Sequence, residues 1–258
     1  ERNKVKYVSF DMWETYRIIT KHVFPSAICI TDHFHVIQEL NRRVDRVRIR
    51  VQNRFRKTIN TLKPKENNKT ITPEEIVELE EASRYYYVLK KFNWLLFSTN
   101  KKILDVNVDR KFNRTLNRYL NYSEILDFML AIDDELEDAF YLRNDVTYFY
   151  DHCTYDTAKK QLEKIIIDFR SSPIAEMSPF ANTLTNWKRE IINSFIIVDD
   201  KANRKMNTAI VENRNKSIKL IKHASNGYLN WERFRNRILY TLNEDTTFYY
   251  TSIRKDGK

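Results

Sequence analysis

Two aspartates each follow a short apolar segment near the start of the sequence. Asp11 comes directly after residues 6–10 (KYVSF), and Asp32 comes directly after residues 27–31 (AICIT). Apolar side chains at helical spacing lie between the two segments, so we predict a strand–helix–strand unit with parallel strands and a right-handed crossover. Parallel strands end at one edge of a sheet, about 4.8 Å apart, and carboxylates gathered there suit Mg²⁺, which prefers oxygen ligands.

Both aspartates also have a structural interpretation. Asp11 lies three residues before Glu14, which is close to the spacing of a capping box, and Asp32 directly precedes a predicted helix that begins near Phe34. Aspartate is a favoured N-cap because its carboxylate accepts hydrogen bonds from the free N–H groups of the first turn. The spacing alone leaves both interpretations open.

A third carboxylate with basic neighbours lies far along the chain. We predict a helix over residues 205–223, on which five side chains share one stripe or border it: Glu212, Lys216, Lys219, His223 and Asn215. One hypothesis is that Glu212 binds a metal ion while the lysines hold a phosphate backbone. The other is a solvated helix face with a Glu212–Lys216 pair, worth about 0.3–0.5 kcal/mol. Helical periodicity does not separate the two.

Basic residues are concentrated on a helix predicted over residues 34–57. They are Arg42, Arg43, Arg46, Arg48, Arg50, Arg54, Arg56 and Lys57, against Glu39 and Asp45. Cationic side chains release counterions when they neutralise phosphates, so this helix is predicted to contact a nucleic acid backbone. The alternative is structural, with the arginines pairing to acidic helices elsewhere in the chain.

Composition excludes several function classes. The 258 residues include two glycines, Gly227 and Gly257, where average usage would give roughly eighteen. A phosphate-binding loop or a dinucleotide fingerprint needs glycines where the backbone approaches phosphate. NAD, FAD and Walker-type ATP binding are therefore excluded, and no nucleotide cofactor is expected. The net charge of +10 indicates a polyanionic partner.

Cysteines, histidines and hydropathy indicate the surroundings of the protein. Cys29 and Cys153 are isolated, which argues against a disulfide framework or a zinc site and favours a reducing compartment. The five histidines are scattered and predict no zinc site either. No apolar run approaches the ~20 residues of a membrane span, and the N-terminus has no signal-peptide pattern. We therefore expect a cytoplasmic protein without a membrane partner.

The middle of the chain is predicted to be helical. Residues 63–72 are polar and predict a surface loop. Thr72-Pro73-Glu74-Glu75 then predicts a helix start, with threonine as N-cap and proline at the first helical position. From there to about residue 195 the periodicity predicts an all-helical block, which includes one helix opened by Ser178-Pro179 and running through Ile192.

The C-terminal part carries a clear helix end and a clear helix start. Asn226-Gly227 is placed where a left-handed C-terminal cap closes a helix. A further helix is predicted over residues 231–242, with Asn230 as its cap.

Several motifs occur in a characteristic order. The first group is Val8-Ser9-Phe10-Asp11-Met12 with Tyr16, then Phe24-Pro25-Ser26-Ala27, then Thr31-Asp32-His33-Phe34-His35-Val36. The second group is Val211-Glu212-Asn213 with Asn215, Ile218-Lys219 and Ile221-Lys222, then Gly227-Tyr228 and Phe234-Arg235 with Arg237-Ile238. Together, over residues 5–242, these motifs resemble the signature of bacterial insertion-sequence transposases of the ISL3 family.

The resemblance implies a fold and a reaction. Transposases of this kind have an RNase H-like core and a DDE triad that uses two divalent metal ions, Mg²⁺ or Mn²⁺. The implied fold class is a partial α/β RNase H-like core with two parallel strands and a large all-helical insertion, mostly α overall. Matched to the family motifs, Asp11 is the second aspartate of the triad and Glu212 is its glutamate, and both are metal ligands.

The resemblance also assigns other residues and the organisation of the chain. Supporting roles fall to Asp32, His35 and Asn215, and DNA contact to Arg42, Arg43, Arg46, Arg50, Arg54, Lys216, Lys219, Lys222, Arg235 and Arg237. The implied parts are a partial core (1–60), an insertion (61–200), C-terminal core helices (201–245) and a mobile tail (246–258). His33 and Asn213 depart from the family's arginine and glycine.

The expected function is DNA transposition by phosphodiester cleavage and strand transfer at insertion-sequence ends, by a homo-oligomer when full length. The first aspartate of the triad has no counterpart in the sequence, which begins with Glu1 rather than methionine. We therefore expect a fragment that starts within a longer protein and is inactive alone. The alternatives are a non-catalytic DNA-binding remnant that regulates transposition, and an unrelated basic helical protein that binds RNA and keeps Asp11 far from Glu212.

Overall fold

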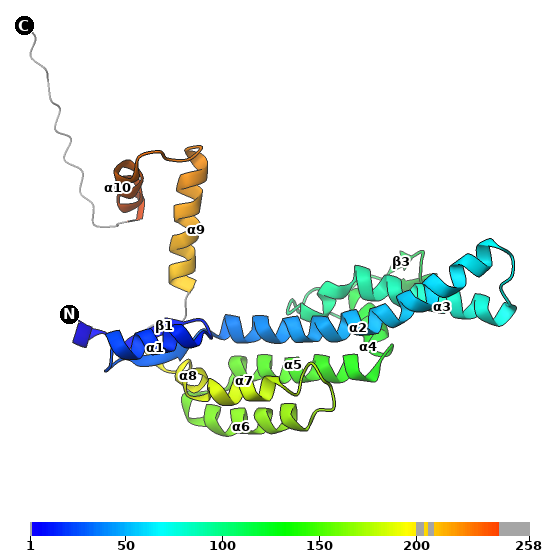
Figure 1. The fold of residues 1–258 in the computed structure, drawn as a ribbon, viewed down its shortest axis with the longest axis horizontal. Coiled ribbons are helices and arrows are strands. Elements are labelled where there is room, and N and C mark those ends of the chain that lie inside the picture. Colours follow the sequence, from blue (N-terminus) through cyan, green and yellow to red (C-terminus); the bar gives the residue numbers. More distant parts are fainter. Residues whose placement is uncertain (1, 200–203, 206–208, 243–258) are drawn as a thin grey trace, which may run out of the picture. The chain divides into compact units, whose positions relative to one another are not determined.

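The structure is a computed structural model that describes residues 2–199, 204–205 and 209–242. For residues 198–199, 204–205 and 209–212 it describes the backbone alone. The chain divides into two compact units, Glu1–Met206 and Asn207–Lys258, and each is described here by itself. Figure 1 shows the helices and strands of both. The tail predicted over residues 246–258 lies outside the described residues.

The first unit opens with the predicted strand–helix–strand motif. A 3₁₀ turn (Arg2–Lys4) leads into β1 (Tyr7–Phe10), α1 (Glu14–Val23) and β2 (Ile28–Thr31). The two strands are parallel, and Phe10 pairs with Thr31 at their carboxyl ends. Phe10 and Ile30 are buried, which fixes the strands against the helices that follow. The parallel pairing predicted from the two apolar segments is confirmed.

The long helix α2 (His33–Asn67) extends along much of the first unit (Figure 1). Its 35 residues extend over about 52 Å. One face is fully buried and supplies much of the core: Val36, Leu40, Val44, Val47 and Val51. These four valines and one leucine recur every three or four residues, so they form one apolar stripe along the helix that faces the core.

The helix α2 ends later than the sequence predicts. The loop predicted over residues 63–72 is wrong in its first half, because α2 continues through Pro64 to Asn67. Leu62 is buried just before the proline, and the Lys65 ammonium lies 2.5 Å from the Glu75 carboxylate on the next helix. These tertiary contacts stabilise the last helical turn of α2, which the polar composition of the segment does not predict.

The helices after this turn follow the prediction in part. The helix start predicted at Thr72 is confirmed: Thr72 is the N-cap, and it exchanges side-chain and backbone hydrogen bonds with Glu75 in a capping box. The elements are α3 (Pro73–Lys91), a 3₁₀ segment η2 (Asn93–Phe97), β3 (Lys111–Asn113), β4 (Arg118–Leu120), α4 (Tyr122–Leu130), α5 (Asp134–His152) and α6 (Tyr155–Ser171). The prediction of an all-helical block is wrong at residues 111–120, where β3 and β4 form an antiparallel hairpin. Each strand has three residues, too few to show an alternating pattern.

The helix predicted from Ser178 through Ile192 is two helices. They are α7 (Phe180–Asn186) and α8 (Lys188–Asn193), separated by Trp187. Trp187 is buried with its ring 6.3 Å from that of Phe10, and the Arg17 guanidinium lies 3.7 Å from the ring centre. Packing of this large ring against β1 and α1 interrupts the helix and seats α8 on β2.

The predicted start of the next helix at Lys205 is also wrong. Lys205 belongs to β6 (Arg204–Lys205), which pairs antiparallel with β5 (Ile197–Asp199). The second unit then holds α9 (Ala209–Ala224) and α10 (Trp231–Leu242). The turn between them is as predicted, with positive φ at Asn226 (51°) and Gly227 (97°). Asn230 Oδ1 accepts the backbone N–H of Arg233 and so begins α10.

The described chain is therefore mostly helical, with one short parallel strand pair near its start. This confirms the coarse fold class, while the RNase H-like core and the predicted domain boundaries stay predictions. None of the described helices is at once long enough and apolar enough to cross a membrane.

Candidate functional site

Asp11 and His35 meet at the carboxyl end of the parallel strands. Asp11 directly follows β1, and His35 lies in the first turn of α2, which directly follows β2. His35 Nε2 is 2.6 Å from Asp11 Oδ1. The Asp11 side chain is 52% exposed and the His35 side chain 25%. The parallel pairing of β1 and β2 thus brings together Asp11 and His35, which the family motifs assigned to one site.

Asp11 does not cap a helix. The N-cap of α1 is Trp13, which makes no side-chain capping bond, and Asp11 contributes its backbone carbonyl to the turn. The capping-box interpretation of Asp11 is therefore wrong. Its carboxylate is half-exposed. His35 holds Oδ1, and Oδ2 makes no hydrogen bond or ion pair with the residues that the structure describes.

Asp32 is the N-cap of α2, as the second interpretation predicted. Its Oδ1 accepts the backbone N–H of Phe34 at 2.9 Å, and its side chain is 3% exposed. The phenol of Tyr150 is buried nearby. Burial and the negative charge of Asp32 both raise the pKa of Tyr150. Asp32 therefore fixes the first turn of α2, and with it the position of His35.

Glu212 lies in α9, in the second unit. The structure describes the backbone of Glu212 alone. The residues that accompany it on α9 are exposed: Asn215, Lys216, Lys219 and Lys222. Arg235 and Arg237 on α10 are exposed as well. Across the described part of the chain, no cluster of three or more His, Cys, Asp or Glu side chains could hold a metal ion.

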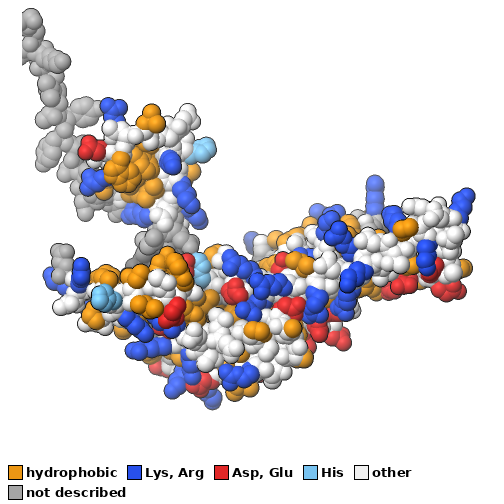
Figure 2. All heavy atoms as spheres, in the orientation of Figure 1, with side chains coloured by type: hydrophobic (Ala, Val, Ile, Leu, Met, Phe, Trp, Pro, Cys, Tyr) orange, Lys and Arg blue, Asp and Glu red, His pale blue; other side chains and the backbone are white. Residues whose placement is uncertain are grey.

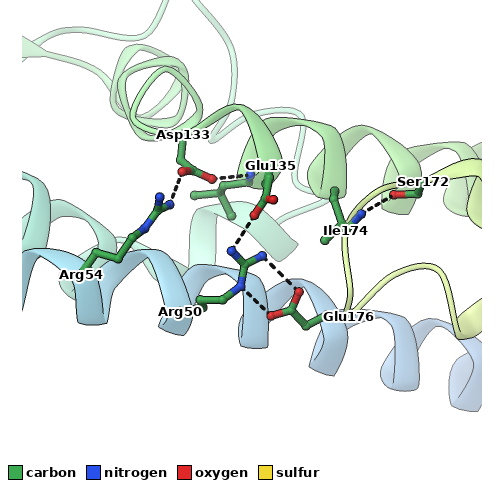
Figure 3. Close-up of polar contacts among 8 residues, drawn as sticks. Arg50, Arg54, Asp133, Glu135, Ser172, Ile174 and Glu176 are labelled. Atoms are coloured by element: carbon green, nitrogen blue, oxygen red, sulfur yellow. Dashed lines mark hydrogen bonds and ion pairs between the residues drawn. The ribbon is translucent and has the colours of Figure 1, made fainter.

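Two arginines of α2 bind acidic residues from elsewhere in the first unit (Figure 3). Arg50 Nε donates to Glu176 Oε1 at 2.8 Å, and Arg50 also pairs with Glu135 at 2.5 Å. Arg54 pairs with Asp133. The hydrogen bond from Arg50 lowers the pKa of Glu176. These contacts join α2 to the start of α5 and to the loop before α7.

Arg43 and Arg48 are also engaged within the protein. Arg43 bonds to Glu39 and to the backbone carbonyl of Glu176, while Arg48 is buried and donates to the Leu89 carbonyl. The structural alternative for the arginine-rich helix is thus realised at Arg50 and Arg54, which pair with acidic residues outside α2. Arg43 and Arg48 have a structural role of another kind, because they bind acidic residues of α2 itself and backbone carbonyls of other segments.

Four further basic residues of α2 lie on its solvent side. Arg42, Arg46, Arg56 and Lys57 are exposed, and Arg42 is 3.7 Å from Glu39. Several of them, together with Arg50 and Arg54, line an open groove of about 600 Å³ along α2. Figure 2 shows basic side chains gathered over the middle of the first unit, with acidic ones between them.

Comparison with known proteins decides the family. The sequence matches the family model of ISL3-type DDE transposases, described as "Transposase", over residues 1–238. The chain belongs to the ISL3 family of transposases. It is 25% identical over 232 residues to the transposase for insertion sequence element IS1001 of Bordetella parapertussis, a match that covers 90% of this chain and 46% of that protein. This ISL3 chain therefore spans about half the length of that relative. No solved structure gives a significant match.

Sequence reasoning missed the acidic partners of the arginines in this ISL3 chain. Glu176 is 126 positions from Arg50, and Asp133 is 79 positions from Arg54. Neither lies in a motif, and no local pattern could have found them. Tyr150, beside Asp32, was missed for the same reason.

Proposed function

We propose that this chain carries two carboxylates of a DDE catalytic site, Asp11 and Glu212, and takes part in the cleavage and joining of DNA during transposition. The observation that carries the proposal is the Asp11–His35 contact at the carboxyl ends of β1 and β2. Ligand sites of parallel sheets lie outside this edge. Membership in the ISL3 family supplies the reaction class.

The donor chemistry at Asp11 fits a hard divalent cation. A half-exposed carboxylate with one oxygen open to solvent is the kind of ligand that Mg²⁺ and Mn²⁺ take. Asp11 and Glu212 would hold the ions. When bound, two such ions activate a hydroxyl for in-line attack on a phosphodiester and stabilise the leaving oxygen.

His35 and Asp32 are positioning residues in this proposal. His35 fixes one oxygen of Asp11, so the other oxygen keeps a defined direction; hydrogen bonds to a ligating carboxylate orient it in this way. Asp32 caps α2 and so holds the turn from which His35 projects. Asn215 lies one helical turn from Glu212 on α9 and is assigned the equivalent supporting role there.

The fold proposal follows from the same strands. We propose that β1, α1 and β2 are part of an RNase H-like core over residues 1–60. Residues 61–200 are the insertion, and residues 201–245 return to the core with Glu212. The support is the parallel register of β1 and β2 and the order of the family motifs.

The DNA-contacting surface is proposed to be the solvated side of α2 and the exposed basic residues of α9 and α10. On α2 it consists of Arg42 and Arg46, extended by Arg56 and Lys57. Arg43, Arg50 and Arg54 border it while also holding the unit together. On the C-terminal helices it consists of Lys216, Lys219, Lys222, Arg235 and Arg237.

DNA binding by the full chain tests the surface. Fluorescence anisotropy with a labelled duplex, repeated across salt concentrations, compares wild type with Arg42→Glu/Arg46→Glu. A Lys160→Glu/Lys159→Glu variant is the matched control, since it makes the same charge change on exposed α6. We expect the arginine variant to reduce the salt slope by roughly two, the number of phosphate contacts removed. Equal losses in both variants would contradict the proposed surface.

Metal binding tests the carboxylates. Titration of the full chain with Mn²⁺, followed by electron paramagnetic resonance, compares Asp11→Asn and Glu212→Gln with Glu78→Gln, a control at an exposed position on α3. Both site variants should weaken the same binding event and the control should not. The family motifs match two carboxylates of the triad to this sequence, Asp11 and Glu212, so we propose that the chain alone leaves supercoiled plasmid intact. Metal-dependent nicking that Glu212→Gln abolishes would contradict this expectation.

The DNA-binding remnant is the second candidate. The exposed cations along α2 favour it, because they can bind phosphate whether or not a metal site forms. It predicts salt-dependent DNA binding together with Mn²⁺ binding that is unchanged in Asp11→Asn.

A further inference from the structure

A pocket lined by aromatic and basic side chains lies beside the hairpin β3–β4, in the segment that was predicted to be all helical. Figure 1 shows β3 near α3, at the far end of α2 from β1. The pocket has a volume of about 590 Å³. The aromatic residues of its wall are Tyr87, Phe92, Phe112 and Tyr122. Neither Asp11, His35 nor the groove along α2 contributes to it.

Aromatic rings are unusually exposed around this pocket. Phe112 is 49% exposed and Tyr122 is 42% exposed, although burial of each would be favourable. Outside the lining, Tyr119 is 67% exposed and its ring centre is 5.1 Å from that of Phe112 on the paired strand. Trp94 is 39% exposed and packs edge-on against Tyr122. Several aromatic rings in and beside the pocket are thus accessible to solvent.

The charge at the pocket is positive. Its lining contains three cationic side chains, Lys91, Lys111 and Arg114, and one carboxylate, Asp109. Lys91 Nζ donates to the Tyr87 hydroxyl at 2.9 Å. Burial raises the pKa of Tyr87, and hydrogen bonds from Lys91 and Thr115 outweigh burial, so the pKa is lowered overall. A ligand with aromatic rings and negative charge matches both features.

The hairpin that carries Phe112 is held rigidly. Leu116 in its turn is 7% exposed and belongs to the core, and Asn113 Oδ1 accepts two backbone N–H groups of the turn. The side-chain amide of Asn121 donates to the carbonyls of Val106 and Val108. The backbone that carries Phe112 is therefore anchored before a ligand binds, which reduces the entropy lost on binding.

We propose that this pocket binds an unpaired base of a DNA strand, with the base stacked on Phe112 and Tyr122 and the adjoining phosphates at Lys111 and Arg114. The inference rests on the proposed function in taking DNA as the nucleic acid, and it adds a second DNA site that recognises single-stranded structure. Bases stack on aromatic side chains irrespective of sequence, and basic residues beside them track the backbone. A paired duplex keeps its base faces covered and cannot use these rings.

Two measurements on the full chain test the proposal. Anisotropy titrations compare a single-stranded oligonucleotide with the duplex of the same sequence. For Phe112→Ala we expect roughly 10-fold weaker single-strand binding, the effect of losing about one base stack, and unchanged duplex binding. Phe112→Trp should restore the affinity. Tyr141→Ala is the control, because Tyr141 is an equally exposed aromatic residue (54%) on α5. Ultraviolet cross-linking of a 5-iodouracil oligonucleotide should give an adduct at Phe112 or Tyr122.

Failure of this proposal is distinguishable from failure of the proposed function. If duplex DNA binds and depends on Arg42 and Arg46, but Phe112→Ala and Tyr141→Ala behave alike on single strands, the pocket proposal alone is overturned. Adducts confined to residues outside the pocket overturn it as well. If neither duplex nor single-stranded DNA binds, both proposals fail.

Discussion

Replacing Arg50 with methionine separates arginines that hold the protein together from arginines that contact DNA. Methionine keeps much of the side-chain volume and removes the three contacts of the guanidinium with Glu176 and Glu135. Arg56→Met is the matched control. Arg56 is exposed on the same helix and makes no ion pair or hydrogen bond with the residues that the structure describes.

The size of the effect follows from the exposure of each partner. Glu176 is 17% exposed and accepts two hydrogen bonds from Arg50, an arrangement worth about 1–2 kcal/mol. Glu135 is 44% exposed, so water screens its pair and less than about 1 kcal/mol is expected. Arg50→Met should therefore lower the free energy of unfolding by about 2 kcal/mol. Arg56→Met should change it by less than about 0.5 kcal/mol.

The assay is urea denaturation followed by circular dichroism at neutral pH and at about pH 3, below the ordinary pKa of glutamate. The pKa of Glu176 is lowered by Arg50, so the pair stabilises the protein above the ordinary carboxyl pKa. This contribution is lost as the pH falls through the lowered value. The difference between wild type and Arg50→Met should shrink accordingly in acid. Equal destabilisation by both variants, or a difference independent of pH, would refute the reasoning.

Three further outcomes follow from the site and the hairpin. Asp32→Ala should lower the free energy of unfolding by about 1 kcal/mol through loss of the α2 cap, while Asp32→Asn retains most of it; thermal denaturation measures both. His35→Ala should weaken Mn²⁺ binding roughly 10-fold, because the orientation of Asp11 is lost. The control is His152→Ala at an exposed position, which should leave Mn²⁺ binding unchanged in the same electron paramagnetic resonance titration. Leu116→Ala should cost about 2–3 kcal/mol, visible as faster amide exchange over residues 111–120; unchanged exchange there would show that the turn does not depend on Leu116.

Elements with strong local signals could be predicted from the sequence. The apolar runs before Asp11 and Asp32 gave the parallel strands, and the capping box at Thr72 gave the start of α3. Asn226-Gly227 marked the end of α9, and Asn230 marked the start of α10. The caps and the turn depend on a few neighbouring residues, and each strand is marked by its own apolar run, so these elements can be predicted from local sequence.

Elements that depend on distant partners could not be predicted. The last turn of α2 passes Pro64 because Lys65 pairs with Glu75 and Leu62 is buried. The helix break at Trp187 reflects packing on Phe10. The hairpin at β3–β4 is too short to alternate, and its turn is held by burial of Leu116. These ion pairs and packing contacts join residues that are distant in the sequence, so they form only when the chain folds.

The candidate site shows the same division. The motifs placed Asp11 and His35 in one region, and the structure puts them in direct contact. Spacing did not decide between capping and ligand roles, and the structure separates the two aspartates: Asp32 caps a helix and Asp11 does not. Whether Glu212 joins Asp11 remains a prediction, since it lies in the other unit.

The most direct test of the central proposal is to map cleavage of the full chain by Fe²⁺ bound in place of Mg²⁺. With ascorbate and peroxide, bound iron releases hydroxyl radicals that cut the backbone next to the ion. A shared site predicts cuts beside both Asp11 and Glu212, all of which are lost in Asp11→Asn and equally in Glu212→Gln. Cuts beside one carboxylate that persist when the other is substituted would contradict the proposal.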